Sequence, residues 1–136
     1  MEIAVIFPLS RRSFSLWYQF KVLATGLEEE GVRVSLKESY YQGLSRYDLI
    51  VWWAPFRTYD FERRKFKADV FFNPIDTNEI SDFVISKLKG RTKLVIAPSS
   101  HNAELWKKAG FNAEVVPHGI IPEDIPEECE LNDELY

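Results

Sequence analysis

Apolar residues along the chain follow two kinds of pattern, one typical of strands and one typical of helices. Short apolar or alternating runs predict six strands. These runs lie at residues 3–7, 32–36, 47–53, 70–72, 94–97 and 113–116. Apolar residues at helical spacing predict a helix between Ser13 and Gly31, a second at residues 78–88, and a third that ends before Gly110. Ser13 is expected to cap the first helix.

Strand and helix alternate in order along the chain, and the connections are long enough for crossovers. Such alternation predicts an α/β fold with a Rossmann-like parallel sheet and helices on both faces, which is a three-layer sandwich. In sheets of this type, ligands bind beyond the carboxyl ends of the strands. The segments expected to line that edge are residues 8–12, 54–57, 73–77, 98–101 and 117–119.

The length of 136 residues predicts one domain with a single sizeable core. Residues 1–121 form the expected Rossmann-like domain, and residues 122–136 an acidic linker or tail. The single cysteine, Cys129, excludes an internal disulfide framework and suits a reducing compartment. Neither a signal peptide nor a membrane-spanning stretch is evident, so a cytoplasmic location is expected.

Charge is distributed unevenly along the chain. The tail carries seven acids and no base, and the rest of the chain carries 17 bases against 14 acids. The tail is interpreted either as a solvated linker or as a segment that folds over a basic patch or a partner. The modest basic excess of the body argues against a nucleic-acid-binding surface.

The run APSSHNAELWKKAGFNAEVVPHGI resembles the end of the amino-terminal domain of glycosyltransferases with two Rossmann domains, known as the GT-B type, especially retaining family 4. In that family a strand ends in serine, a helix closes with glycine, and a short strand leads into Pro-His-Gly or Pro-Asn-Gly. The matching positions are Ser99 or Ser100, Leu105, Gly110, Val115, Val116, Pro117, His118 and Gly119. The glycine-rich loop often found after the family's first strand is FPLSRRS in this chain.

The resemblance implies the acceptor-binding half of a glycosyltransferase. Its implied partners are a carboxy-terminal domain that binds the nucleotide-sugar donor, in cis or in trans, and a sugar or lipid-linked acceptor. The alternative hypothesis is a non-catalytic Rossmann-like module that binds a sugar, a phosphate or a protein. An edge made to receive a second domain also predicts self-association into homo-oligomers.

Several candidate site residues lie in the expected ligand-binding segments. The resemblance places His118 and Gly119 near an interdomain cleft, where His118 is a candidate catalytic residue that donates to a phosphate or a sugar hydroxyl. A turn histidine satisfied by backbone is an equal alternative. Ser99, Ser100 and His101 stand at a helix start, where free amides favour a phosphate. Ordinary helix capping also explains the serines.

Three further candidates precede other helices. Asp76 is a candidate general base toward an acceptor hydroxyl, but it or Thr77 is more simply expected to cap the next helix. Arg11 and Arg12 are candidates for binding a phosphate group of the acceptor, since guanidinium groups match phosphate geometry. Solvated surface arginines are the alternative.

Aromatic residues supply the last candidates. The basic, aromatic segment at residues 56–67 suits a peripheral contact with anionic lipid head groups, or is a solvated helix with aromatics in the core. Trp52 or Trp53 is a candidate for stacking on a sugar ring, against the commoner outcome of burial. No spacing of histidines and Cys129 is typical of a metal site, and no dinucleotide or P-loop motif is present, so no cofactor is expected.

Overall fold

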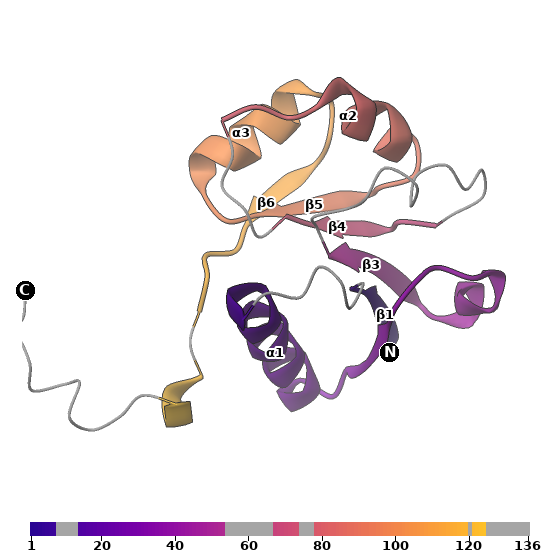
Figure 1. The fold of residues 1–136 in the computed structure, drawn as a ribbon, viewed down its shortest axis with the longest axis vertical. Helices are drawn as coiled ribbons and strands as arrows, with labels where there is room; N and C mark the ends of the chain where they lie inside the picture. The colour runs from indigo at the N-terminus through magenta and orange to yellow at the C-terminus, as the bar shows by residue number, and fades with distance from the viewer. Residues whose placement is uncertain (8–13, 54–66, 74–77, 120, 125–136) are drawn as a thin grey trace, which may run out of the picture.

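Six strands form one sheet in the order β2-β1-β3-β4-β5-β6, with every neighbouring pair parallel (Figure 1). The computed structural model describes residues 1–7, 14–53, 67–73, 78–119 and 121–124. The strands are β1 (Glu2–Ile6), β2 (Arg33–Lys37), β3 (Leu49–Trp53), β4 (Val70–Phe72), β5 (Leu94–Ala97) and β6 (Ala113–Val115). The helices are α1 (Phe14–Glu29), α2 (Asp82–Leu88) and α3 (Ser100–Lys108), with 3-10 helices η2 (Gln42–Arg46) and η4 (Pro122–Asp124).

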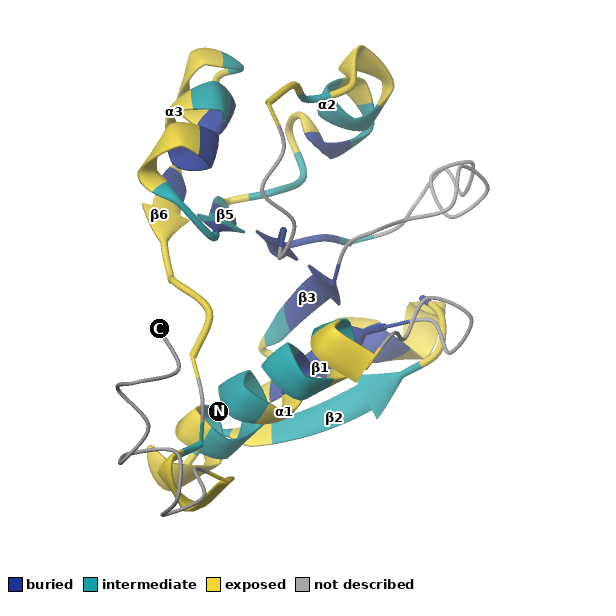
Figure 2. Ribbon diagram, turned by 60° about the vertical axis from the view of Figure 1, so that its left-hand side comes forward, coloured by how far each residue is buried: buried dark blue, intermediate teal, exposed yellow. Residues whose placement is uncertain are grey.

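The strand order reverses direction once, and this reversal produces three layers. The chain runs outward from β1 to β2, returns across β1 to β3, and then proceeds to β6. Because crossovers in parallel sheets are right-handed, such a reversal places helices on opposite faces. Accordingly α1 covers one face, and α2 and α3 cover the other (Figures 1 and 2). The predicted α/β three-layer fold is therefore confirmed.

Alternate residues of the central strands enter two separate core layers. On the α1 side, Trp53 stacks on Phe72 with ring centroids 4.0 Å apart, and Phe20 of α1 packs against the Trp53 ring. On the α2 and α3 side, Phe71 packs against Trp106 of α3. Strands buried on both faces explain why the sequence shows continuous apolar runs there.

Two connections have features that the sequence pattern did not predict. The link between β2 and β3 contains only the short 3-10 helix η2, which buries Leu44. Helix α2 begins at Asp82 because Ser81 caps it, accepting a hydrogen bond from the Phe83 N–H. The expectation that Asp76 or Thr77 caps this helix is therefore wrong, since Ser81 is the residue whose hydroxyl meets the first turn.

The predicted helix ends at glycine are confirmed. Gly31 and Gly110 have φ angles of 82° and 98°, a region that glycine adopts without steric cost. The Ser13 cap and the segment at residues 54–66 lie outside the described residues.

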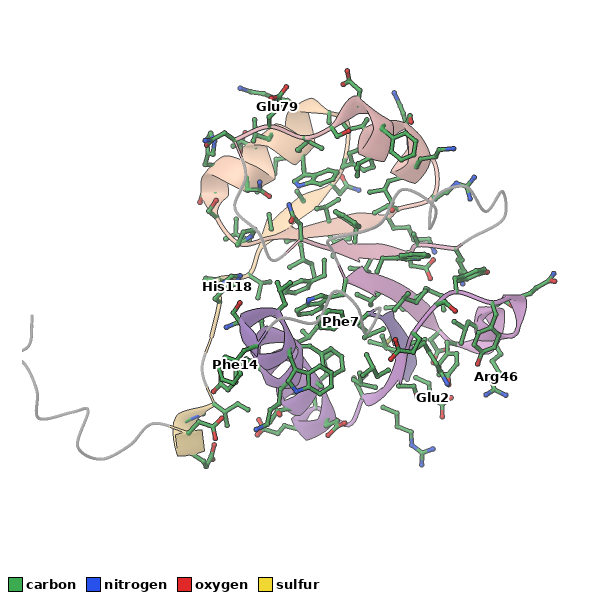
Figure 3. All side chains as sticks on the ribbon, in the orientation of Figure 1. Glu2, Phe7, Phe14, Arg46, Glu79 and His118 are labelled. Atoms are coloured by element: carbon green, nitrogen blue, oxygen red, sulfur yellow. The ribbon has the colours of Figure 1, made fainter. Side chains whose placement is uncertain are left out.

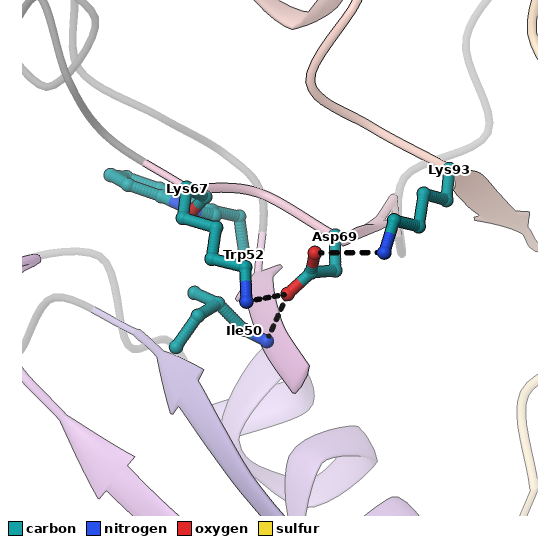
Figure 4. Close-up of polar contacts among 5 residues, drawn as sticks. All are labelled: Ile50, Trp52, Lys67, Asp69 and Lys93. Atoms are coloured by element: carbon teal, nitrogen blue, oxygen red, sulfur yellow. Dashed lines mark hydrogen bonds and ion pairs between the residues drawn. The ribbon is translucent and has the colours of Figure 1, made fainter. Parts of the chain in front are cut away.

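A buried carboxylate ties together the amino ends of the middle strands. Asp69, 2% exposed, precedes β4, and its Oδ2 accepts a hydrogen bond of 2.9 Å from the Ile50 N–H of β3 (Figure 4). The ammonium groups of Lys67 and Lys93 lie 3.5 and 3.7 Å from its oxygens. Because this cluster lies at the amino edge of the sheet, opposite the edge where ligands bind in such folds, its role is structural.

Candidate functional site

The carboxyl ends of β4, β5 and β6 meet at one edge of the sheet, here called the rim. Backbone hydrogen bonds hold its segments side by side: the Asn73 N–H donates to the Ile96 carbonyl, and the Val116 N–H donates to the Ala97 carbonyl, each at 2.9 Å. The rim thus brings the start of α3, which follows β5, close to the segment that follows β6. The sequence-based grouping of residues 98–101 with 117–119 matches this arrangement.

Helix α3 begins at the rim with one serine acting as its cap. The Ser99 hydroxyl accepts a hydrogen bond of 3.2 Å from the Asn102 N–H, and the Ser99 carbonyl accepts one from the Ala103 N–H. In the described part of the chain, no acceptor meets the N–H groups of Ser100 and His101, which are both exposed. Ser99 therefore has the capping role, and two amides at the positive end of the helix remain available to an oxygen ligand.

A buried pair of amide side chains fixes the position of this helix start. The Asn73 Nδ2 donates to the Asn102 Oδ1 at 3.1 Å, and both residues are buried. The pair joins the end of β4 to the first turn of α3. The sequence analysis placed Asn73 in a segment expected at this edge, but it predicted neither Asn102 nor the pairing of the two side chains. The only signals were an asparagine directly after an apolar strand and another in the first turn of a helix.

The segment after β6 has no regular secondary structure and docks onto α1. The Gly119 N–H donates to the Gln19 Oε1, and the Gln19 amide donates back to the Gly119 carbonyl, both at 3.2 Å. A Cβ at Gly119 would lie 3.3 Å from the Val22 side chain, so close approach explains this glycine better than backbone conformation does. His118 is exposed where the chain leaves the sheet (Figure 3).

Tyr18 completes the attachment of this segment. Its hydroxyl donates to the Asp124 Oδ2 at 2.9 Å and accepts from the Ile121 N–H at 3.1 Å. We call the contacts of Tyr18 and Gln19 with Gly119, Ile121 and Asp124 the clasp. Sequence reasoning missed it because its two sides are about 100 residues apart and neither side has a local pattern.

The clasp also changes the acidity of its tyrosine. The Ile121 N–H acts to lower the pKa of Tyr18, but burial, the hydrogen bond to Asp124 and the negative charge of Asp124 together raise it above the ordinary value of 10.0. The raised pKa extends the neutral, hydrogen-donating form of Tyr18 to a higher pH than that of an ordinary tyrosine.

The two candidate tryptophans are both buried, so neither offers a face to a sugar ring. The Trp52 indole donates to the Lys67 carbonyl at 2.8 Å. Trp53 ends β3 beside Phe7, where the strand order reverses, and its indole nitrogen has no partner among the described residues. Burial, the alternative outcome, is confirmed.

Several candidates lie outside the described residues, namely Arg11, Arg12, Asp76 and residues 56–66. The phosphate-binding role of the two arginines, the general-base role of Asp76 and the lipid contact of residues 56–66 therefore stay predictions. Within the described ranges, no cluster of three metal-ligating side chains occurs. None of the helices described is long and apolar enough to cross a membrane.

The described rim can therefore bind oxygen ligands through two free N–H groups, with exposed His101 and His118 nearby. No hydrogen bond within the described chain pairs a nucleophile with a base at this rim. No protein-family model, curated protein or solved structure shows a significant match to this chain.

Proposed function

We propose that this chain is the acceptor-binding half of a GT-B-type glycosyltransferase, and that the rim holds the acceptor. A second domain, in cis or in trans, binds the nucleotide sugar and delivers its glycosyl group to an acceptor hydroxyl. One observation carries the proposal: the free amides at the start of α3 and the His118 segment lie together at the carboxyl edge of a parallel sheet.

The chemistry of the rim supports an acceptor that carries phosphate or clustered hydroxyl groups. Helix amino termini attract anions because their free N–H groups point at the ligand and the helix dipole adds partial positive charge. The resemblance of residues 97–120 to the end of a GT-B amino-terminal domain supports placing the second domain beyond Gly119. Cytoplasmic location and contact with a lipid-linked acceptor belong to the same proposal.

The test is a substitution that removes one backbone N–H group from the start of α3 and leaves the helix intact. Ser100 is the first residue of α3, a position that proline tolerates, and Ser99 before it is extended with φ −145° and ψ 160°. Ser100→Pro therefore deletes one free N–H, whereas Ser100→Ala keeps it and serves as the matched control.

The ¹⁵N-labelled full chain is titrated by NMR with a sugar phosphate, a short-chain polyprenyl-phosphate sugar and nucleotide sugars. We expect an acceptor mimic to shift the amides of His101, Asn102, His118 and Gly119, and Ser100→Pro to weaken binding about tenfold while Ser100→Ala does not. Shifts confined to other surfaces, or equal binding by both variants, would contradict the proposal.

A second candidate function is a binding module without catalysis. It is favoured by the polar side chains of the rim, which already have structural hydrogen bonds: Ser99 caps α3 and Asn73 pairs with Asn102. Supplying a donor-binding GT-B domain and a nucleotide sugar distinguishes the two. Sugar transfer to the bound acceptor supports the first function, and selective binding without transfer supports the second.

A further inference from the structure

A shallow pocket lies away from the rim contacts, between α1 and the segment that ends in η4. Its volume is about 510 Å³, and the described residues that line it are Phe14, Tyr18, Lys21 and Asp124. Three of them belong to α1, and Asp124 comes from the opposite end of the chain. The clasp is what brings these two parts together.

One wall of the pocket is an exposed aromatic surface. The rings of Phe14 and Tyr18 are one helical turn apart on α1, with centroids 6.4 Å apart and planes 21° from parallel. Phe14 is 86% exposed. An exposed phenylalanine beside a second ring offers a broad apolar face, and such faces commonly mark binding sites.

The polar edge of the pocket consists of one anion and one cation. The hydrogen bond from the Tyr18 hydroxyl holds the Asp124 carboxylate at 2.9 Å, so this acceptor is fixed in position. Lys21 supplies an ammonium group, which only donates hydrogen bonds, whereas the carboxylate only accepts them. The two charges balance, which favours a neutral ligand over an anion or a cation.

We propose that this pocket binds a neutral sugar ring. A pyranose has an apolar face of C–H groups that stacks on aromatic rings, and hydroxyl groups around its edge that both donate and accept hydrogen bonds. The stacked face meets Phe14 and Tyr18, one hydroxyl donates to Asp124, and another accepts from Lys21. This site stands on its own four residues and does not require the rim to bind a ligand.

The experiment titrates the full chain with cellotriose, maltotriose and mannotriose and follows the Phe14 and Tyr18 ring signals by NMR. We expect at least one trisaccharide to bind, and Phe14→Ala to weaken its binding about tenfold. Asp124→Asn keeps an oxygen acceptor but loses the charge, so it weakens binding by a smaller factor. Phe83→Ala is the matched control, because Phe83 is a 40% exposed aromatic residue on α2, remote from the pocket.

Other outcomes would overturn the site. They are no binding of any trisaccharide, unchanged binding in Phe14→Ala, or preference for an anionic oligogalacturonide. Ser100→Pro separates this site from the rim: it alters only the start of α3, so trisaccharide binding stays unchanged. Loss of binding in Ser100→Pro would place the sugar at the rim and refute the pocket.

Discussion

Two neighbouring serines at the start of α3 have different roles. The hydroxyl of Ser99 satisfies the Asn102 N–H, whereas Ser100 is exposed and its side chain has no hydrogen bond to the described residues. The resemblance to GT-B enzymes treats either serine as the matching position. Only the structure distinguishes Ser99 from Ser100, because a cap residue requires an extended backbone and a hydroxyl that faces the first helical turn.

Ser99→Ala is expected to lower the free energy of unfolding by about 1 kcal/mol, since it leaves an amide in the first turn of α3 without its acceptor. Urea denaturation measures the loss. Ser100→Ala is the control and should change stability by about 0.5 kcal/mol or less. Equal losses in the two variants would refute the distinction between the serines.

Asp69 is the residue whose replacement should cost the most stability among the described charged groups. Asp69→Ala leaves the buried Ile50 N–H without an acceptor, and such a loss costs about 1–3 kcal/mol. Asp69→Asn keeps an oxygen for this N–H and should lose less. Glu104→Ala, which removes an exposed ion pair to Lys107, should cost about 0.5 kcal/mol or less in the same urea experiment.

At the scale of elements, the clasp decides where the chain goes after the sheet ends. Segment 116–119 leaves β6 without regular secondary structure and is then held along α1 by Gln19 and Tyr18. The clasp therefore connects the last rim segment to the helix that follows the first strand. It also creates the pocket proposed for a sugar, because Asp124 would otherwise not reach α1.

The clasp should depend on pH through Tyr18. Because the folded-state pKa is raised, the clasp's contribution to stability is complete below the ordinary tyrosine value of about 10 and is lost as pH rises through the folded value. A phenolate no longer donates to Asp124, and the two negative charges repel.

Ring-carbon NMR shifts measure this titration one tyrosine at a time. Tyr18 should titrate above its ordinary value, and the Ile121 amide shift should change with it. Tyr47 should titrate below its ordinary value, because hydrogen bonds from Ser35 and Arg46 and the charge of Lys37 lower its pKa despite burial. Asp124→Asn should lower the pKa of Tyr18; an unchanged value would mean that the carboxylate does not control this tyrosine.

At the scale of the whole molecule, the two edges of the sheet differ. Strand β2 ends one edge, and the short strand β6 ends the other, close to the rim. Val115 and Val116 are exposed at the β6 edge. Unpaired strand edges with apolar side chains favour pairing with another chain.

We therefore expect the chain to self-associate in solution through β6. Multi-angle light scattering should give a mass that rises with concentration, and Val116→Lys should shift it back toward the monomer. Phe83→Lys changes an exposed apolar residue away from this edge and should leave the mass unchanged. A constant monomer mass at high concentration would contradict the expectation.

The local pattern of apolar residues was sufficient to predict most strands and helices of this protein. Runs such as residues 70–72 are buried on both faces, and glycines such as Gly110 adopt a backbone conformation that other residues avoid. Both signals are contained within a few residues, which is why they can be read from the sequence. The edge at which a ligand was expected also followed from the parallel sheet, because all carboxyl ends lie at one edge.

Tertiary structure decided which distant groups meet. The chain returns across β1 by way of the short connection that contains η2. The Asn73–Asn102 pair and the clasp join distant segments through single polar side chains. A lone tyrosine or asparagine has no periodicity, so the sequence marks it as polar without naming its partner. Its role follows only once packing of the apolar faces has fixed which surfaces lie within hydrogen-bonding distance.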